Sequence, residues 1–492
     1  MHKLTPWVNY SIANRDNLTE DEGEVDKMEQ YPTEQLEVTI DHINYKGQGY
    51  ARYIHAPDRG SQGRHLHLNI PFTVPGDVVQ VTVDNAKGRH KATVHYDKII
   101  HPSPMRDTTI PMDEAICAGT PLVFMKYADQ LEYKLNMVQN ALAENDFDPA
   151  LVKPVLGMDD PNRYRNKMEL TFGSEGELGM HQQDNYRRII DMKDSYIATE
   201  AMVEIKHIVS QWRRDFDLPG YVKDTHTGLL RNLLMRQSFS TGEMMVVLYA
   251  TEGPAAYAEA ADELTRRLLA AQPQIQSLQW IVHQDIADRI QSDEVHILHG
   301  RDFIYDELSG FKYRIWPNTF FQANPIQAEQ MVKIALEMAQ VNSNLRVLDL
   351  YCGVGTFSLP LARAAKDLCG IEIVDTSIQS ARRNAQDNGL TNTHFITSDA
   401  RSALKTLKDT WGQPDLLLLN PPRSGAGGKV MRSIGRFGTD KIIYVSCNPN
   451  TLAEDMRWLR DFEYQLQEVQ PVDQFPHTHH VECVVLMQKV KE

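Results

Sequence analysis

The C-terminal part of the chain alternates short apolar runs with segments of helical spacing. Apolar runs that predict buried strands occur at 346–350, 370–373, 394–397, 415–419 and 442–445. Helices are expected from about residue 357 and over 376–388. Strands that alternate with helices favour a parallel sheet with right-handed crossovers, which binds ligands at the carboxyl ends of its strands. We therefore predict an α/β, Rossmann-like domain over 311–492, with functional residues directly after its strands.

A glycine-rich turn follows the first of these strands, over residues 349–356. Gly353 would let the backbone approach a ligand closely. Glu372 lies at the end of the next strand, about 20 residues later, where an acid accepts hydrogen bonds from ribose hydroxyls. Asp399, after the following strand, is placed to bind an adenine amino group. Leu359 stands near the third glycine of a dinucleotide fingerprint, so S-adenosylmethionine fits better than a dinucleotide. A turn required only by packing remains the alternative.

The fourth predicted strand ends in Asn420-Pro421-Pro422-Arg423. Two prolines make this loop rigid and stop it from continuing as a helix. Asn420 would then lie at the sheet edge and face the donor methyl group.

Cys447 ends the fifth strand, and Glu482 begins a later apolar run. A uracil ring is too weak a nucleophile at C5 to accept a methyl group directly. Addition of a thiolate at C6 makes C5 nucleophilic, and a base must later remove the C5 proton. Cys447 and Glu482 would supply these two groups. Taken singly, an ordinary strand-end cysteine and a solvated carboxylate are the simpler interpretations.

The rest of the chain predicts three further parts. Residues 1–34 are acidic and of low hydrophobicity, which indicates a disordered tail. Short alternating strands at 36–40, 78–83 and 93–96 indicate a small β-barrel over 35–99. Residues 100–310 read as a mixed α+β central domain. The barrel carries four basic residues that suit RNA or a solvated hairpin equally well, namely Lys87, Arg89, Lys91 and Lys98.

Composition limits the location and the partners of the chain. The 492 residues include five scattered cysteines, which is typical of a reducing compartment and predicts a cytoplasmic protein. No apolar run is long enough to span a membrane, so no membrane partner is expected. The net charge of −15 argues mildly against nucleic acid, although the acidic tail contributes part of it. The Arg163–Lys167 cluster mixes aromatic and basic residues, as in a phosphate-tracking surface or an exposed turn.

Five motifs together resemble the bacterial RNA 5-methyluridine (uracil-C5) methyltransferases in order and spacing. They are 320–324, 350–356, 420–425, 445–449 and 475–482. The resemblance covers about residue 35 to the end and implies S-adenosylmethionine-dependent methylation of uridine C5 in RNA. It also implies that residues 35–98 form a TRAM domain, a small OB-like RNA-binding barrel, and that 164–167 is a family signature.

The resemblance also assigns roles to residues. Cys447 would be the nucleophile that forms the C6 adduct, and Glu482 would be the general base. The cofactor-binding residues would be Gln322, Tyr351, Gly353, Glu372, Asp399 and Asn420, and Phe320 and Gln322 would hold the target uracil. The TRAM-like barrel favours 23S rRNA over tRNA as the substrate, and we expect a monomer.

Two positions depart from the family pattern. Related TRAM-containing enzymes often bind an iron–sulfur cluster through four cysteines, but here only Cys117 matches, with Pro111, Thr120 and Ser195 at the other places. One thiolate cannot hold such a cluster, so we expect none and no other metal. Asn420 stands where the family usually has aspartate, which predicts weaker cofactor binding or a changed rate.

Three alternatives to the 23S rRNA assignment remain open at this point. The first is a tRNA uridine-C5 methyltransferase. The second is an amino-methyltransferase, because enzymes that methylate exocyclic amines use Asn-Pro-Pro followed by an aromatic residue; Arg423 in that place argues against it. The third is a catalytically silent RNA-binding protein that kept the fold.

Overall fold

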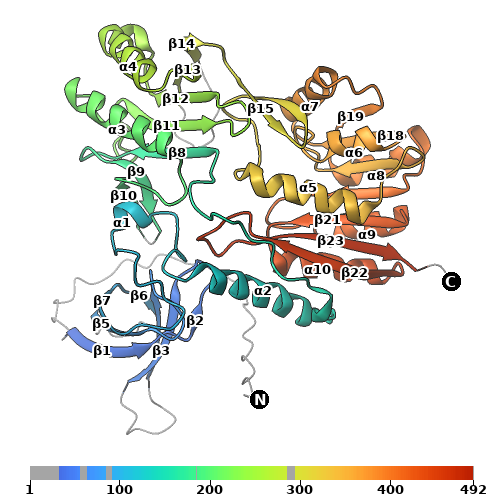
Figure 1. Ribbon diagram of the computed structural model, residues 1–492, viewed down its shortest axis with the longest axis horizontal. Helices are drawn as coiled ribbons and strands as arrows, with labels where there is room; N and C mark the ends of the chain where they lie inside the picture. Colours follow the sequence, from blue (N-terminus) through green and yellow to red (C-terminus); the bar gives the residue numbers. More distant parts are fainter. Residues whose placement is uncertain (1–32, 56–63, 85–90, 184, 285–293, 491–492) are drawn as a thin grey trace, which may run out of the picture.

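The computed structural model describes residues 33–55, 64–84, 91–183, 185–284 and 294–490. The predicted acidic tail, apart from its last two residues, lies outside this range, as do Lys87 and Arg89. Three groups of strands follow one another along the chain, and helix α2 runs beneath the C-terminal group (Figure 1). The division into separate domains at 35, 100 and 311 stays a prediction.

The N-terminal group consists of two small sheets that share an apolar core. One sheet has the order β1-β5-β7, and its strands are β1 (Thr33–Thr39), β5 (Val78–Asp84) and β7 (Tyr96–His101). The other has the order β2-β3-β4-β6, with strands β2 (His42–Ile43), β3 (Gly49–His55), β4 (Arg64–Ile70) and β6 (Lys91–Thr93). Leu36, Leu68 and Val81 are buried between them. This strand-rich region confirms the predicted class, but the single strand expected over 93–96 is wrong. The chain changes sheets there, because β6 pairs with β4 and β7 pairs with β5.

The central group is a seven-stranded sheet of order β10-β9-β8-β11-β12-β13-β14. Its strands are β8 (Lys167–Phe172), β9 (Leu178–Gln182), β10 (Asn185–Asp191), β11 (Leu230–Gln237), β12 (Met244–Ala250), β13 (Ile275–Val282) and β14 (Glu294–Gly300). Helices α3 (Glu200–Asp215) and α4 (Ala258–Ala271) share its core, with Trp212 and Trp280 fully buried. Short elements before and within this group are α1 (Glu114–Cys117), η2 (Pro149–Leu151) and η3 (Pro254–Tyr257).

The C-terminal group is a seven-stranded sheet of order β19-β18-β17-β20-β21-β23-β22. Its strands are β17 (Arg346–Leu350), β18 (Asp367–Glu372), β19 (Thr393–Thr397), β20 (Leu416–Leu419), β21 (Lys441–Ser446), β22 (Tyr464–Val472) and β23 (Glu482–Lys489). The first five are parallel, as predicted. β23 lies antiparallel between β21 and β22, which the alternation of strands and helices did not reveal.

Helices connect and cover the strands of this sheet (Figure 1). They are α5 (Pro325–Ala339), α6 (Ser358–Ala364), α7 (Asp375–Asp387), α8 (Ala400–Thr410), α9 (Gly428–Phe437) and α10 (Pro449–Arg460). A hairpin of β15 (Ile304–Leu308) and β16 (Phe311–Ile315) precedes α5. The strand order reverses between β17 and β20, and such a reversal opens a crevice at the carboxyl ends of the strands.

Helix α2 (Tyr127–Ala143) lies far from this sheet in sequence but packs against it. Val138 and Leu142 belong to the same apolar core as Leu348 and Ile442. Lys134 is fully buried on α2, and its Nζ donates to Asp473 Oδ1 at 2.5 Å and to the carbonyl of Phe475 at 3.0 Å. The helix therefore holds the loop 473–481 between β22 and β23.

We expect breakage of the buried Lys134–Asp473 ion pair to destabilise the protein. Lys134→Met leaves a buried carboxylate without its cation, so we expect the free energy of unfolding to fall by about 3–5 kcal/mol. Urea-induced unfolding measures the change. Adding Asp473→Asn removes the lone charge and should recover most of the loss.

The exposed pair Lys153–Glu468 provides a matched control, since both side chains keep contact with water. Lys153→Met should cost less than about 1 kcal/mol. Equal losses for Lys134→Met and Lys153→Met would contradict the role given to burial.

Candidate functional site

The pairing of β21 with β23 brings the predicted thiol and carboxylate to one edge of the sheet. Ser446 lies opposite Cys483 in this antiparallel pair. The next residues outward, Cys447 and Glu482, therefore lie at the same edge of the sheet. The side chain of Asn448 then caps α10 by accepting a hydrogen bond from the backbone N–H of Asn450 at 3.1 Å.

Burial shifts the pKa of both groups upward. It raises the pKa of Glu482, which is 7% exposed, to about 7, against the opposing effect of Arg423. It also raises the pKa of the half-buried Cys447 thiol, and the negative charge of Glu482 adds to this shift. Arg423 acts in the other direction on the thiol. One guanidinium thus favours the charged form of both groups.

Arg423 is a site residue to which the sequence pattern gave no role. Its carbonyl accepts hydrogen bonds from Asn448 Nδ2 and Thr451 Oγ1, each at 3.2 Å, which ties its loop to the start of α10. Its Nη2 lies 3.4 Å from His480 Nε2. The signal was its place in Asn-Pro-Pro-Arg, directly after a strand that ends at the same edge as Cys447.

The two histidines before Glu482 are neutral at pH 7. Burial lowers the pKa of His479 to about 4 and that of His480 to about 3. His479 Nδ1 is buried and has no hydrogen-bond partner in the described part of the chain. The two rings therefore add no positive charge to this loop at pH 7.

The glycine turn after β17 has the open backbone expected of a ligand cradle. A Cβ atom on Gly353 would meet no described atom within 4 Å. The Gly353 N–H donates to Glu372 Oε2 at 3.3 Å, and Glu372 Oε1 accepts from the N–H groups of Ile373 at 2.8 Å and Val374 at 3.0 Å. Tyr351 has a φ of 63°, which turns the chain sharply at the end of β17. The turn and the carboxylate thus form one rigid unit.

Asp349, within β17, is a buried acid to which the sequence pattern gave no role. Burial raises its pKa to about 7, and Ser358 Oγ donates to its Oδ2 at 2.5 Å. Its Oδ1 has no hydrogen-bond partner among the described residues. A carboxyl group between two leucines of a buried strand was the available signal.

Two other predicted cofactor residues differ in their surroundings. The side chain of half-buried Asn420 makes no hydrogen bond with any described residue, although its N–H donates to the Leu350 carbonyl at 3.3 Å. Asp399 is exposed, and its Oδ1 accepts from the N–H of Ser402 at 2.9 Å to cap α8. Asp399 therefore also has a structural role.

Phe320 and Gln322 lie on the loop before α5. Phe320 is 69% exposed, whereas Gln322 is buried. Gln322 Oε1 accepts from Gln474 Nε2 at 3.4 Å, and its carbonyl accepts from Asn166 Nδ2 at 2.8 Å. Gln322 is thus linked to the loop that leads to Glu482.

The Arg163–Lys167 cluster is not an exposed turn, because its residues are buried or half-buried, whereas its use as a surface that tracks phosphates stays a prediction. Tyr164 and Asn166 are buried, and the Tyr164 hydroxyl donates to the carbonyl of Pro476 at 3.0 Å. Arg163 pairs with Asp194 at 3.2 Å. Through Tyr164, the cluster supports the loop 473–481 from the side of the central sheet.

The residues at the four cluster-ligand positions do not fit an iron–sulfur centre. Cys117 is buried with its Sγ 3.7 Å from the Pro111 carbonyl, and Thr120 Oγ1 donates to the Cys117 carbonyl at 2.7 Å. Ser195 Oγ accepts from the backbone N–H groups of residues 197 and 198. No group of three or more metal-ligating side chains occurs in the described residues.

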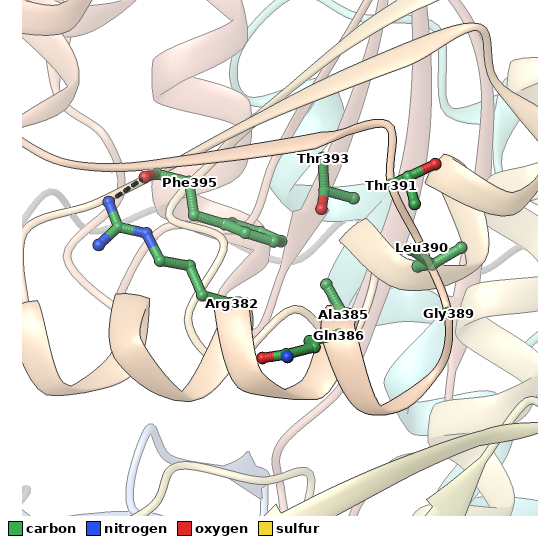
Figure 2. A pocket seen from close by; sticks show the side chains of 8 residues that line it. All are labelled: Arg382, Ala385, Gln386, Gly389, Leu390, Thr391, Thr393 and Phe395. Atoms are coloured by element: carbon green, nitrogen blue, oxygen red, sulfur yellow. Dashed lines mark hydrogen bonds between the residues drawn. The ribbon is translucent and has the colours of Figure 1, made fainter.

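A separate cavity of about 260 Å³ opens between α7 and β19 (Figure 2). It lies near Gly389 and Thr393, at the amino end of β19, and Arg382 reaches across it to donate to the Phe395 carbonyl. No predicted site residue lines it. The edge that carries Cys447 and Glu482 is at the opposite end of the strands.

Comparisons with known proteins agree with this geometry. Residues 126–490 match the tRNA (uracil-5-)-methyltransferase family. An RNA methyltransferase of Halalkalibacterium halodurans is 33% identical over 92% of this chain and 96% of its own length. One of Clostridium tetani is 35% identical over 75% of this chain and 80% of its own length. The chain belongs to the tRNA (uracil-5-)-methyltransferase family.

A solved structure supports the fold. The Pyrococcus abyssi tRNA (uracil-54, C5)-methyltransferase, in complex with S-adenosyl-L-homocysteine, aligns with a TM-score of 0.69 at 24% identity, over 92% of this chain and all of that one. Family membership makes this protein an S-adenosylmethionine-dependent RNA methyltransferase that acts on uracil C5. It favours uracil over the exocyclic amine considered above. Among the described residues, no helix is both long and apolar enough to cross a bilayer.

The neutral side chain of Asn420 is expected to limit the affinity for S-adenosylmethionine. Asn420→Asp adds a negative charge near the expected sulfonium, so S-adenosylmethionine should bind about tenfold more tightly, or roughly 1.4 kcal/mol. Isothermal titration calorimetry measures the affinity. S-adenosylhomocysteine, which lacks the positive charge, should gain much less. Unchanged donor affinity together with an unchanged rate would contradict the proposed placement.

Proposed function

We propose that Cys447 bonds covalently to C6 of a target uridine and that Glu482 is the general base of the reaction. The observation that carries this proposal is the Ser446–Cys483 pairing, which sets residues 447 and 482 side by side. The buried Glu482 carboxyl, with a pKa of about 7, suits a base that works near neutral pH.

The proposed reaction begins with addition of sulfur to the uracil ring and ends with its elimination. The Cys447 thiolate bonds to C6, and the C5–C6 electrons move to O4 as an enolate. C5 of the enolate then bonds to the methyl carbon of S-adenosylmethionine while the sulfur–methyl bond breaks, which leaves neutral S-adenosylhomocysteine. Glu482 then takes the C5 proton, the C5–C6 double bond forms again, and the sulfur–C6 bond breaks to release the thiolate.

The remaining site residues are proposed to hold the two substrates. We assign the methyl donor to Gln322, Tyr351, Gly353, Glu372, Asp399 and Asn420. Support comes from the open space above Gly353 and from the fixed Glu372 carboxylate. The exposed Phe320 ring and the neighbouring Gln322 would hold the uracil, which must leave its stack because C6 is shielded there.

We favour 23S rRNA as the substrate because of the TRAM-like N-terminal sheets, and we place the reaction in the cytoplasm of a monomeric enzyme. tRNA is the second candidate. The matching family and the Pyrococcus abyssi enzyme are both named for tRNA, which supports this alternative.

The roles of Cys447 and Glu482 predict different effects for their variants. Glu482→Gln cannot remove the C5 proton, so the methylated RNA should stay bonded to the protein instead of turning over. Loss of the neighbouring negative charge should also help the thiolate to form. Denaturing gel electrophoresis of the protein with RNA carrying a radioactive methyl group detects the adduct.

Cys447→Ala is the control, because it should give neither adduct nor product. With 5-fluorouridine RNA, the unaltered protein should form a stable adduct at residue 447, since fluorine cannot leave as a cation. Turnover in Cys447→Ala would overturn covalent catalysis.

The choice of RNA is tested in cells that lack the gene. Mass-spectrometric mapping of 5-methyluridine should show one or more sites missing from 23S rRNA and none missing from tRNA. Expression of Cys447→Ala should not restore the sites. Loss from tRNA alone would establish the second candidate, and loss from neither pool would reject both.

A further inference from the structure

A turn of the N-terminal sheets lies directly against the loop 473–481. Gly47 belongs to the β2–β3 turn and has a φ of +79°. A Cβ atom at this position would lie 2.8 Å from Pro121 Cγ and 3.0 Å from His479 Nδ1. Because His479 precedes Glu482 by three residues, this turn forms part of the rim of the site.

The turn is rigid before any ligand arrives. Asn44 Oδ1 accepts from the N–H groups of Lys46 at 2.8 Å and Gln48 at 3.1 Å. Asn44 Nδ2 donates to Gln48 Oε1 and to Asn69 Oδ1, each at 3.0 Å. Gln183, at the end of β9, donates to the Lys46 carbonyl. A preorganised turn loses little entropy on binding.

Tyr45 projects into solvent from this fixed backbone. It is 71% exposed, the highest value among the large hydrophobic side chains of the described residues, and Phe320 follows at 69%. Lys46 is also exposed, with its Nζ 5.9 Å from the centre of the Tyr45 ring. An aromatic ring beside a cation is the combination that binds single-stranded nucleic acid.

We propose that Tyr45 stacks on an unpaired base next to the target uridine and that Lys46 pairs with a phosphate of the same strand. The proposal rests on the proposed function, because it places the target at Cys447. A uridine that leaves its stack exposes the face of a neighbouring base. The occupant of this rim is thus a single-stranded RNA segment that flanks the methylated nucleotide.

A second aromatic–cation pair has its aromatic ring on β10, next to the end of β9 that contacts the turn. Tyr186, on β10, is 58% exposed, and its hydroxyl accepts from Lys223 Nζ at 2.9 Å. Gln183 joins this hairpin to the carbonyl of Lys46. Tyr45 and Tyr186 therefore lie on segments that contact each other beside the loop 473–481.

Binding of fluorescein-labelled oligouridine, measured by fluorescence anisotropy in a Cys447→Ala background, tests the proposal without the chemistry. Tyr45→Ala should lower the affinity about tenfold, the effect of losing one base–aromatic stack, whereas Tyr45→Phe should stay within about twofold. Lys46→Ala should reduce the slope of log affinity against log salt by about 0.7, as expected for one phosphate contact.

Trp458, in the last turn of α10, gives a matched control. Its aromatic ring is exposed, and the ring centre lies 4.2 Å from Cζ of Arg432 on α9. Trp458→Ala should not change the affinity. Unchanged affinity in Tyr45→Ala, an equal loss in Tyr45→Phe, or no binding of oligouridine by the parent would overturn the proposal. Failure of the proposed function would give a different result: the unaltered protein would form no 5-fluorouridine adduct at Cys447.

Discussion

The antiparallel placement of β23 is the constraint that brings Cys447 and Glu482 to one edge of the sheet. Had β23 run parallel to β21, its first residue, Glu482, would lie at the opposite edge from Cys447. β22 in turn pairs antiparallel with β23, so the last residue of β22 lies at the same edge as Glu482. The loop 473–481 can therefore remain at this edge over its whole length, between the two strands that fix its ends.

This loop is held by buried polar contacts from distant parts of the chain. Lys134 and Tyr127 of α2 bond the two oxygens of Asp473, and Gln130 accepts from the N–H of His477 at 2.9 Å. Tyr164 bonds the carbonyl of Pro476. Buried polar networks of this kind stabilise one conformation when their members are satisfied. The position of Glu482 thus depends on residues more than 300 positions earlier.

The sequence predicted what local patterns encode. Apolar runs located the five parallel strands, and strand ends located Cys447 and Glu482, because both signals lie within a few neighbouring residues. Lys134 and Asp473 are 339 positions apart, and nothing in either neighbourhood shows that they pair. The exposed-turn interpretation of residues 163–167 was wrong for the same reason, since polar groups of this segment meet partners that are distant in the sequence.

The charges at the site constrain the order of events in the proposed reaction. A thiolate at Cys447 and a carboxylate at Glu482 repel each other in a buried setting, and Arg423 faces both. Thiolate formation therefore favours a protonated Glu482. Once sulfur is bonded to C6 and the methyl group is on C5, the sulfur carries no charge. The repulsion is then gone, and Glu482 can lose its proton to become the base. A carboxyl group with a pKa of about 7 can take both forms at neutral pH, which an exposed glutamate cannot do.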